Sequence, residues 1–337
     1  MKNFNFDGRN ILLIGGAGYV GSVMAERFLH LGAKIHVLDN FLYGNGHSIS
    51  HLLEDPNFEY SVTDFAEVSA LKKALKGITD VVLLASLVGD PICRKYPKLA
   101  IKTNKEASLR LLDAMNDSDI ERFIFTSTCS NYGIHDGEEL ATEEADLNPQ
   151  SLYAETKIAV EECILEKQNG LDFSPTILRI STAYGLSPRM RFDLTISDFT
   201  MTLVAGEPLL VYDADTWRPY CHVRDIAKAC MTVFDQSADN VRGEVFNVGS
   251  NNQQFTKRMI VNEILKHVTD PQPEYRPGST DPRDYRVSFS KISNQLEFQC
   301  DYSVESHIPG LVSSIKQGLF PTSRKSEFGN YEISGAS

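Results

Sequence analysis

Apolar runs of five to seven residues recur along the first 180 residues of the chain, and an amphipathic stretch of helix length follows each one. The runs lie at 10–14, 34–38, 80–85, 122–127 and 174–180. Strands that alternate with helices in this way indicate βαβ units, in which the strands are parallel and the crossovers are right-handed. The pattern therefore predicts an α/β fold with a doubly wound parallel sheet.

The pattern changes after Tyr184, where the chain becomes irregular and richer in proline, arginine and aromatic residues. We expect 1–180 to form the sheet domain and 181–318 to form mainly a smaller lobe. Residues 223–234 look helical and 243–248 look strand-like, so part of 223–250 is expected to return to the sheet and interleave the lobes. The last stretch, 319–337, is polar and rich in glycine and serine, which predicts a loosely held tail.

The chain has more acidic than basic residues, and this limits the kinds of partner that it is expected to bind. The 337 residues carry a formal net charge of −12, which argues against a large basic surface for nucleic acid. Six cysteines occur without a Cys-x-x-Cys pair, and the eight histidines form no ligand pattern, so we expect reduced thiols and no metal. No apolar run reaches 18 residues, and the N-terminus does not resemble a signal peptide, so a soluble, cytoplasmic protein is expected.

A glycine-rich turn follows the first predicted strand. Gly15, Gly18 and Gly21 recur every three residues and lead into a helix, which is the context of a dinucleotide-binding fingerprint. Glycines there let the backbone approach a pyrophosphate, whose charge meets the unpaired N–H groups of the helix N-terminus. Asp39 lies 18 residues after Gly21, where a carboxylate holds the adenosine ribose hydroxyls and repels a 2′-phosphate. We therefore expect a Rossmann-like domain that binds NAD rather than NADP.

Tyr153 and Lys157 form the most informative polar pair, with Ser151 two residues upstream. They lie four residues apart in a predicted helix at 153–167, so the phenol and the ammonium share one helix face. A free tyrosine has a pKa of ~10, and each unit of lowering needs about 1.4 kcal/mol of preferential stabilisation of the phenolate. A neighbouring ammonium supplies such stabilisation. The alternative is a half-exposed aromatic ring beside a solvated lysine.

Together these features resemble the extended short-chain dehydrogenase/reductases of the NAD-dependent epimerase/dehydratase family. The resemblance covers about residues 10–316 and includes, in order, Asp64 in Val62-Thr63-Asp64, the segment 84–89, Thr103-Asn104, the segment 126–133 and the segment 218–225. It implies a nucleotide diphosphate sugar as the substrate. The segment 185–194 is similar to a branch that contains bacterial GDP-heptose 4-dehydrogenases.

The resemblance implies a role for each matching residue. Tyr153 is expected to be the general acid/base, Lys157 to hold the nicotinamide ribose and lower the Tyr153 pKa, and Thr128 to share the proton of the substrate hydroxyl. Asp64 is expected to contact adenine and Asn104 to support the central helix, although a structural role also fits both. The residues expected to contact NAD are Gly15, Gly18, Tyr19, Val20, Gly21, Asp39, Asn40, Asp64, Leu84, Ala85, Ser86, Thr126, Tyr153 and Lys157.

Arginines in the second half of the chain suit the two phosphates of such a substrate, because a planar guanidinium binds phosphate through two parallel hydrogen bonds. Arg218 matches the phosphate-binding arginine of the family, and Arg276 or Arg283 is expected to supply a second contact. Arg189 and Arg191 are further candidates for substrate binding. For each arginine, a surface salt bridge is the alternative.

Three candidate substrate-binding residues depart from the family pattern. Thr182 stands where relatives usually carry asparagine. Cys129 and Ser130 follow Thr128 where sugar 4,6-dehydratases carry the Asp-Glu pair that removes water, so ordinary dehydration is disfavoured. Cys129 is an acid/base candidate only if its thiol pKa is lowered, and a small packed side chain is the preferred interpretation. His222 is likewise expected to be buried rather than catalytic.

The leading hypothesis is an NAD-dependent enzyme that oxidises the C4 hydroxyl of a nucleotide diphosphate sugar, as an epimerase or as a dehydrogenase. A 4-keto reductase uses the same groups in reverse, and a dehydratase is a further alternative. A non-catalytic NAD-sensing protein is disfavoured because Tyr153, Lys157 and Thr128 are all present. By resemblance alone we expect a homodimer that pairs through helices at 103–115 and 153–167.

Overall fold

The computed structural model describes residues 4–116, 118–134, 139–269, 271–278, 281, 283–322 and 328–333. Among these residues, seven parallel strands form one sheet in the order β10-β6-β5-β4-β1-β2-β3. The strands are β1 (Asn10–Ile14), β2 (Lys34–Asp39), β3 (Phe58–Val62), β4 (Asp80–Leu83), β5 (Arg122–Thr128), β6 (Ser174–Ile180) and β10 (Glu244–Val248). The doubly wound parallel sheet expected from the sequence is confirmed.

Helices cover both faces of this sheet. One face carries α2 (Val68–Ala74), α5 (Ser108–Met115) and α6 (Leu152–Lys167), and the other carries α1 (Gly21–Leu29), α8 (Val223–Phe234) and α11 (Ser290–Leu296). Leu111 and Val160 are buried in the first interface, and Phe28 and Phe234 in the second. Because helices exclude water from both sides, the central strands are apolar throughout, and this is why they stand out in the sequence as continuous apolar runs.

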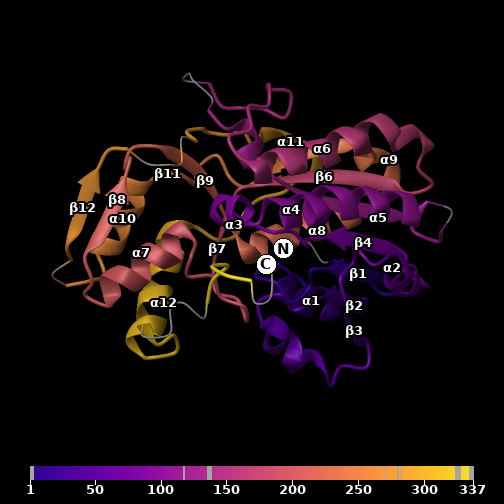
Figure 1. The fold of residues 1–337 in the computed structure, drawn as a ribbon, viewed down its shortest axis with the longest axis horizontal. Helices are drawn as coiled ribbons and strands as arrows, with labels where there is room; N and C mark the ends of the chain where they lie inside the picture. The colour runs from indigo at the N-terminus through magenta and orange to yellow at the C-terminus, as the bar shows by residue number, and fades with distance from the viewer. Residues whose placement is uncertain are drawn as a thin grey trace.

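A smaller lobe lies beside the carboxyl ends of these strands (Figure 1). In its described part, β7 (Thr182–Tyr184), β9 (Trp217–His222) and β11 (Gln254–Thr256) form one sheet, and β8 (Leu209–Tyr212) pairs with β12 (Pro273–Arg276). Helices α7 (Thr195–Val204), α10 (Lys257–Leu265) and α12 (Val304–Lys316) share an apolar core with them. Figure 1 shows α7, α10, α12, β8 and β12 gathered on the left, opposite the large sheet.

Short segments complete the described structure. They are α3 (Asp90–Lys95), α4 (Pro97–Ala100), α9 (Ala238–Val241), η1 (Asn45–Leu52), η2 (Ile101–Ala107), η3 (Cys129–Tyr132) and η4 (Gln168–Gly170). Within the described ranges, none of the helices combines the length and the apolar character that a membrane crossing requires.

The elements differ from the sequence-based expectations mainly at the edges of the sheet. The helix at 223–234 is confirmed, and β10 adds to the free edge of β6, so the chain does return to the sheet after entering the second lobe. Strand β4 ends at Leu83, two residues earlier than expected. Strand β3 was not predicted, because it is the outer strand and only Phe58 of its five residues is buried, so it has no apolar run.

Candidate active site

A cavity of about 700 Å³ opens where β1 lies between β2 and β4, at the carboxyl ends of the parallel strands. Ligands bind in open α/β sheets at this point, because the crossovers leave it in opposite directions. The cavity brings together most of the residues predicted from the sequence. They are Gly15, Gly18, Tyr19, Val20, Gly21, Asp39, Asn40, Asp64, Leu84, Ala85, Ser86, Thr126, Thr128, Ser130, Tyr153, Lys157, Thr182, Arg189, Arg191, Arg218 and Arg283.

The glycine turn forms the floor of one half of the cavity. Gly15 has φ +86°, and a Cβ on it would lie 2.6 Å from the backbone nitrogen of Ala85. A Cβ on Gly21 would lie 2.5 Å from the carbonyl oxygen of Gly15. The backbones of the turn, of the first helix and of the β4 end therefore meet with no room for side chains. This leaves a backbone-lined cradle in front of the N-terminus of α1, which suits a diphosphate.

Asp39 ends β2 at the side of this cradle. The backbone N–H of Phe41 donates to its Oδ1 at 2.9 Å, and that of Ala17 donates to its Oδ2 at 3.1 Å. Burial raises the pKa of Asp39, and these two hydrogen bonds act against that rise. They also fix the carboxylate, whose remaining lone pairs are available to ribose hydroxyls. The glycine cradle and this acid fit an NAD molecule.

The helix that carries the Tyr–Lys pair begins as the sequence indicates. The backbone N–H of Ala154 donates to Ser151 Oγ at 3.3 Å, so Ser151 caps α6. Lys157 is buried one turn further on, and its Nζ donates to the carbonyl oxygen of Thr126 at 2.9 Å. The same Nζ lies 5.9 Å from the centre of the Tyr153 ring. The ammonium thus lies at the end of β5, and the Tyr153 ring lies near it on the same side of α6.

The pKa shifts of this pair reflect the low polarity of their surroundings. Burial lowers the pKa of Lys157 to about 8. Burial also raises the pKa of Tyr153 above its ordinary value, while the charges of Arg191 and Arg283 act to lower it. This direction is the opposite of the lowering that the resemblance implies, because removal of the phenol from water outweighs the nearby positive charges.

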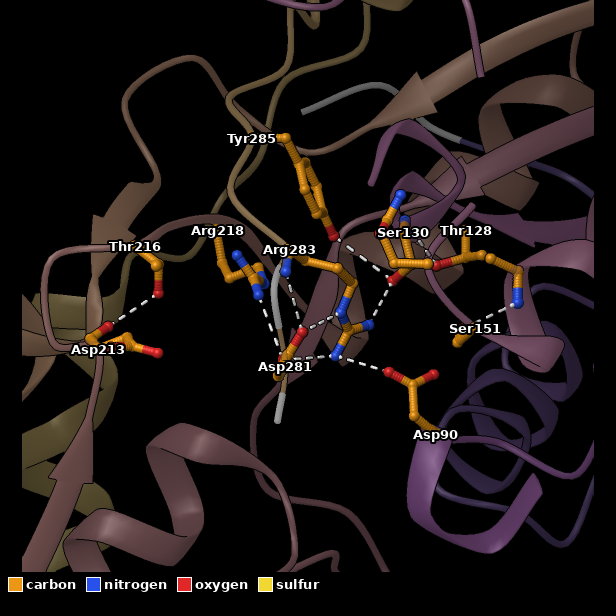
Figure 2. A network of polar contacts seen from close by, with 12 residues as sticks. Asp90, Thr128, Ser130, Ser151, Asp213, Thr216, Arg218, Asp281, Arg283 and Tyr285 are labelled. Carbon is orange, nitrogen blue, oxygen red and sulfur yellow. Dashed lines mark hydrogen bonds and ion pairs between the residues drawn. The ribbon is translucent and has the colours of Figure 1, made fainter. Parts of the chain in front are cut away.

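Two arginines and two aspartates form the far wall of the cavity (Figure 2). Arg283 Nε donates to Asp281 Oδ1 at 2.7 Å, and its Nη2 lies 3.1 Å from Asp90 Oδ2. Arg218 Nη2 lies 3.2 Å from Asp281 Oδ2. Arg283 Nη1 also donates to Ser130 Oγ at 3.0 Å, which joins this wall to the end of β5. Despite burial, the hydrogen bond and charge of Arg283 hold the pKa of Asp281 well below its usual range.

Arg189 and Arg191, predicted as substrate-binding residues, lie on the glycine-turn side of the cavity. Ser187 Oγ donates to the carbonyl oxygen of Tyr19 at 2.7 Å, which holds this segment against the turn. The Arg189 guanidinium lies 5.2 Å from the centre of the Tyr43 ring, and Arg191 is paired with Asp193. An arginine in the sequence does not indicate which half of the cavity it will line, because the cofactor and the expected substrate both carry a diphosphate that an arginine can bind.

Two other predicted substrate residues are not among the described residues that line the cavity. Cys129 is buried, its Sγ donates to the carbonyl oxygen of Arg179 at 3.1 Å, and burial raises its thiol pKa to about 12. It is therefore a packed neutral thiol. Arg276 is exposed on β12, where its Nε donates to Glu274 at 2.8 Å. His222 is also structural, since it caps α8 and burial lowers its pKa to about 3.

Several residues of the cavity wall were not singled out from the sequence. Asp90 and Asp281 both pair with Arg283. Asp281 lies only two residues before Arg283, so the sequence shows a local charged pattern there, whereas it shows no such pattern for Asp90. Lys257 also lines the wall, and burial lowers its pKa. Asn330 and Tyr331 line it as well, although they belong to the stretch expected to be a loose tail.

The resemblance to known proteins agrees with this geometry. Residues 11–249 match the model of the "NAD dependent epimerase/dehydratase family". The chain is 30% identical to UDP-glucuronic acid decarboxylase 1 of Arabidopsis thaliana, over 92% of this chain and 70% of that protein. It is 28% identical to a UDP-glucose 4-epimerase of Corynebacterium glutamicum, over 85% of this chain and 89% of that protein.

Solved structures show the same fold. The UDP-glucuronic acid 4-epimerase from Bacillus cereus, solved in complex with UDP-glucuronic acid and NAD, superposes with a TM-score of 0.83 at 24% identity, over 91% of this chain and 99% of that one. The dTDP-glucose 4,6-dehydratase from Bacillus anthracis, solved with NAD, gives 0.80 at 24% identity, over 92% and 97%. With the glycine cradle and Asp39 in place, the chain belongs to the NAD-dependent epimerase/dehydratase family, and its cofactor is NAD.

Proposed function

We propose that this enzyme oxidises the C4 hydroxyl of a nucleotide diphosphate sugar and returns the hydride to the same carbon, as an epimerase does. One observation carries the proposal. Tyr153 and Thr128 line the same cavity as the glycine cradle at one end and the Arg218–Arg283 wall at the other. When the diphosphate of the nucleotide sugar binds at that wall, the sugar ring lies between the Tyr153 phenol and the half of the cavity that fits the cofactor.

The residues of this chain handle the proton and the orientation of the sugar. Bound NAD supplies the hydride acceptor at the carbon that is oxidised. Tyr153 takes the proton of the C4 hydroxyl on its phenolate oxygen, and Thr128 Oγ1 holds the same hydroxyl by a hydrogen bond. Because burial raises the Tyr153 pKa, the positive charge of Lys157 is needed to stabilise the phenolate. Lys157 is fixed for this task by its hydrogen bond to the Thr126 carbonyl.

The substrate diphosphate binds to Arg218 and Arg283, whose guanidinium groups reach the cavity from the second lobe. Asp281 and Asp90 hold these guanidinium groups in position. The names of the similar proteins given above refer to UDP and dTDP sugars. UDP sugars are therefore the first substrates to test, followed by dTDP, GDP and CDP sugars. The GDP sugars test the finer resemblance of the segment 185–194.

Dehydration is the second candidate reaction, and the buried state of Cys129 counts against it. Elimination of water needs an acid and a base beside the sugar. Of the two positions after Thr128, Cys129 carries a buried thiol whose pKa is raised to about 12, and Ser130 donates no proton at neutral pH. Release of a 4-keto product, or reduction of one, uses the same residues as epimerisation and differs in whether NAD is exchanged.

The decisive experiment replaces Tyr153 by phenylalanine. Turnover of the accepted sugar is expected to fall by about 10²-fold or more, because the proton acceptor is lost, while NAD binding stays intact. Tyr212→Phe is the matched control, since Tyr212 is exposed on β8. Product analysis by NMR with the sugar panel then identifies the reaction. Unchanged turnover of Tyr153→Phe would remove the assigned role, and failure of the wild type to bind NAD would remove the proposal.

We also propose that the enzyme is a cytoplasmic homodimer. Helices α5 and α6 pack side by side on one face of the sheet, and Ile101 is exposed at the start of the helical segment that leads into α5. All six cysteines are free thiols, which supports a reducing compartment. Light scattering at micromolar concentration tests the dimer, and a monomeric mass would contradict it.

A further inference from the structure

The described residues near the C-terminus, 328–333, lie against the active-site cavity. Asn330 and Tyr331 line it, and burial raises the pKa of Tyr331 to about 12. Figure 1 shows this last, yellow segment in the middle of the molecule, between the two lobes and away from α12. We call residues 328–333 the C-terminal strap.

One end of the strap is held by the segment that follows β7. The backbone N–H of Phe192 donates to the carbonyl oxygen of Phe328 at 2.6 Å, and the rings of Phe192 and Phe328 lie 5.8 Å apart. Arg189 Nη2 donates to Asn330 Oδ1 at 2.7 Å. Because Arg189 also lies over Tyr43, this end of the strap is attached beside the glycine turn and the end of β2.

The other end is anchored on the helices that follow β4. Ile333 is only 5% exposed and packs in an apolar group with Leu87, Ile92, Cys93 and Ala100. Glu332 also pairs with Lys95 on α3 at 2.8 Å, but both side chains are exposed, so this ion pair adds little. Ile333 is therefore the main anchor of this end.

The two attachments decide which half of the cavity the strap crosses. One lies at the glycine turn and β2, and the other lies at α3, next to the Leu84–Ala85–Ser86 lining. The first attachment belongs to the half with the glycine cradle and Asp39. The apolar group around Ile333 also includes Leu42 and Tyr43, which follow Asp39, although Asp90 at the start of α3 reaches Arg283 in the other half. The strap therefore covers the part of the cavity that fits NAD.

We propose that Asn330 and Tyr331 are additional NAD-contacting residues and that the strap must detach before NAD can leave, so that the enzyme keeps its NAD from one turnover to the next. This rests on the proposed function, because an epimerase needs the same cofactor molecule for both hydride transfers. The strap thus favours internal oxidation and reduction over the release of NADH after each cycle.

The test measures how fast the cofactor leaves. Protein loaded with NADH is mixed with excess NAD in a stopped-flow instrument, and the loss of bound NADH fluorescence gives the dissociation rate. Ile333→Ser removes the anchor, and a chain that ends at Pro321 removes the whole strap. Leu210→Ser is the matched control, since it also replaces an aliphatic residue but lies exposed on β8. Circular dichroism and thermal melting confirm that each variant is folded.

The expected result is a dissociation rate about tenfold or more above that of the wild type for Ile333→Ser, with at least the same increase for the shortened chain and none for Leu210→Ser. Wild-type dissociation rates in both strap variants would overturn the proposal, even if turnover changes. If the wild type binds no NADH at all, the cofactor assignment fails together with the strap, and the two failures are thereby distinguished.

Discussion

Glu161 and Arg179 form a fully buried ion pair directly behind the active site. Arg179 Nη2 donates to Glu161 Oε2 at 2.7 Å, and both side chains are at most 5% exposed. Glu161 lies one helical turn after Lys157 on α6, and it also accepts hydrogen bonds from Ser127 and from Asn131, the latter at 2.8 Å. The pair therefore joins the catalytic helix, strand β6 and the end of β5 that carries Thr128.

Loss of one charge from this pair should be costly. Glu161→Gln keeps the shape of the side chain but leaves the buried Arg179 guanidinium without its directly paired carboxylate, so the free energy of unfolding should fall by about 3–5 kcal/mol. Urea unfolding measures this value. Asp113→Asn removes one partner of the exposed Lys167–Asp113 pair and serves as the control, with an expected change within about 1 kcal/mol. Equal effects in the two variants would contradict the structural role of the buried pair.

Two buried histidines should make the protein sensitive to mild acid. Burial lowers the pKa of His222 to about 3 and that of His307 to about 4. An unfolded histidine titrates near ~6.5, so below that pH the unfolded state binds more protons and the folded state loses stability, by up to about 1.4 kcal/mol per pH unit for each histidine. The contribution of these two histidines to the free energy of unfolding should therefore be constant above pH ~6.5 and fall towards pH 4.

Unfolding measured at a series of pH values tests this, with His307→Leu as the variant. Between pH 6 and 4, the slope of the free energy of unfolding against pH should decrease by about the contribution of one histidine. His47→Gln, at an exposed position, should leave the slope unchanged. A His307→Leu protein with the full wild-type slope would show that acid sensitivity arises elsewhere.

The glycine turn offers a comparison of two glycines that share a positive φ. Gly15→Ala places a Cβ 2.6 Å from a backbone nitrogen, whereas Gly77→Ala, at φ +72°, meets nothing within 4 Å. Gly77→Ala should lower the free energy of unfolding by only about 1–2 kcal/mol, because a residue with a Cβ is strained at positive φ, and it should leave NAD affinity unchanged. Gly15→Ala should cost more and also weaken NAD binding, because the cradle must open. Calorimetric titration with NAD separates the two outcomes, and equal NAD affinity would contradict the cradle.

The two arginines proposed for the second phosphate contact are also a matched pair. Arg283→Lys removes a planar fork from the cavity wall and should raise the KM of the accepted nucleotide sugar by about tenfold with a smaller change in kcat. Arg276→Lys acts on an exposed side chain paired with Glu274 and should leave both constants unchanged. Steady-state kinetics measures them. A KM increase in Arg276→Lys alone would return the contact to that residue.

The central fold was predictable because buried parallel strands must be apolar on both faces. The apolar runs at 10–14 and 174–180 therefore agree with the observed bounds of β1 and β6. Strand β3 lacks that mark, since one face and the outer edge of the strand meet water. The glycine turn and Asp39 were predictable for a different reason: their spacing follows from the geometry of one strand–turn–helix unit.

The far wall and the strap depend on contacts between distant segments, and this limited their prediction. Asp90 is 193 positions from Arg283 in the sequence, yet their charged groups lie 3.1 Å apart. Ile333 lies in a stretch of mostly polar residues and glycines without a regular apolar pattern, so the sequence does not indicate that it is buried. Local pattern cannot show such pairings, which exist only after the second lobe has folded against the sheet.

Strand β10 has a consequence for how the protein is made. The sheet is incomplete until residues 244–248 have left the ribosome, because β10 covers the edge of β6 and α8 and α11 cover one face of the sheet. A nascent chain of 180 residues carries the glycine turn but exposes a strand edge and an apolar surface, which favour aggregation. Synthesis past residue 296 is therefore needed to complete the sheet and the helices that cover it, and a gene fragment cut at the apparent domain boundary should yield insoluble protein.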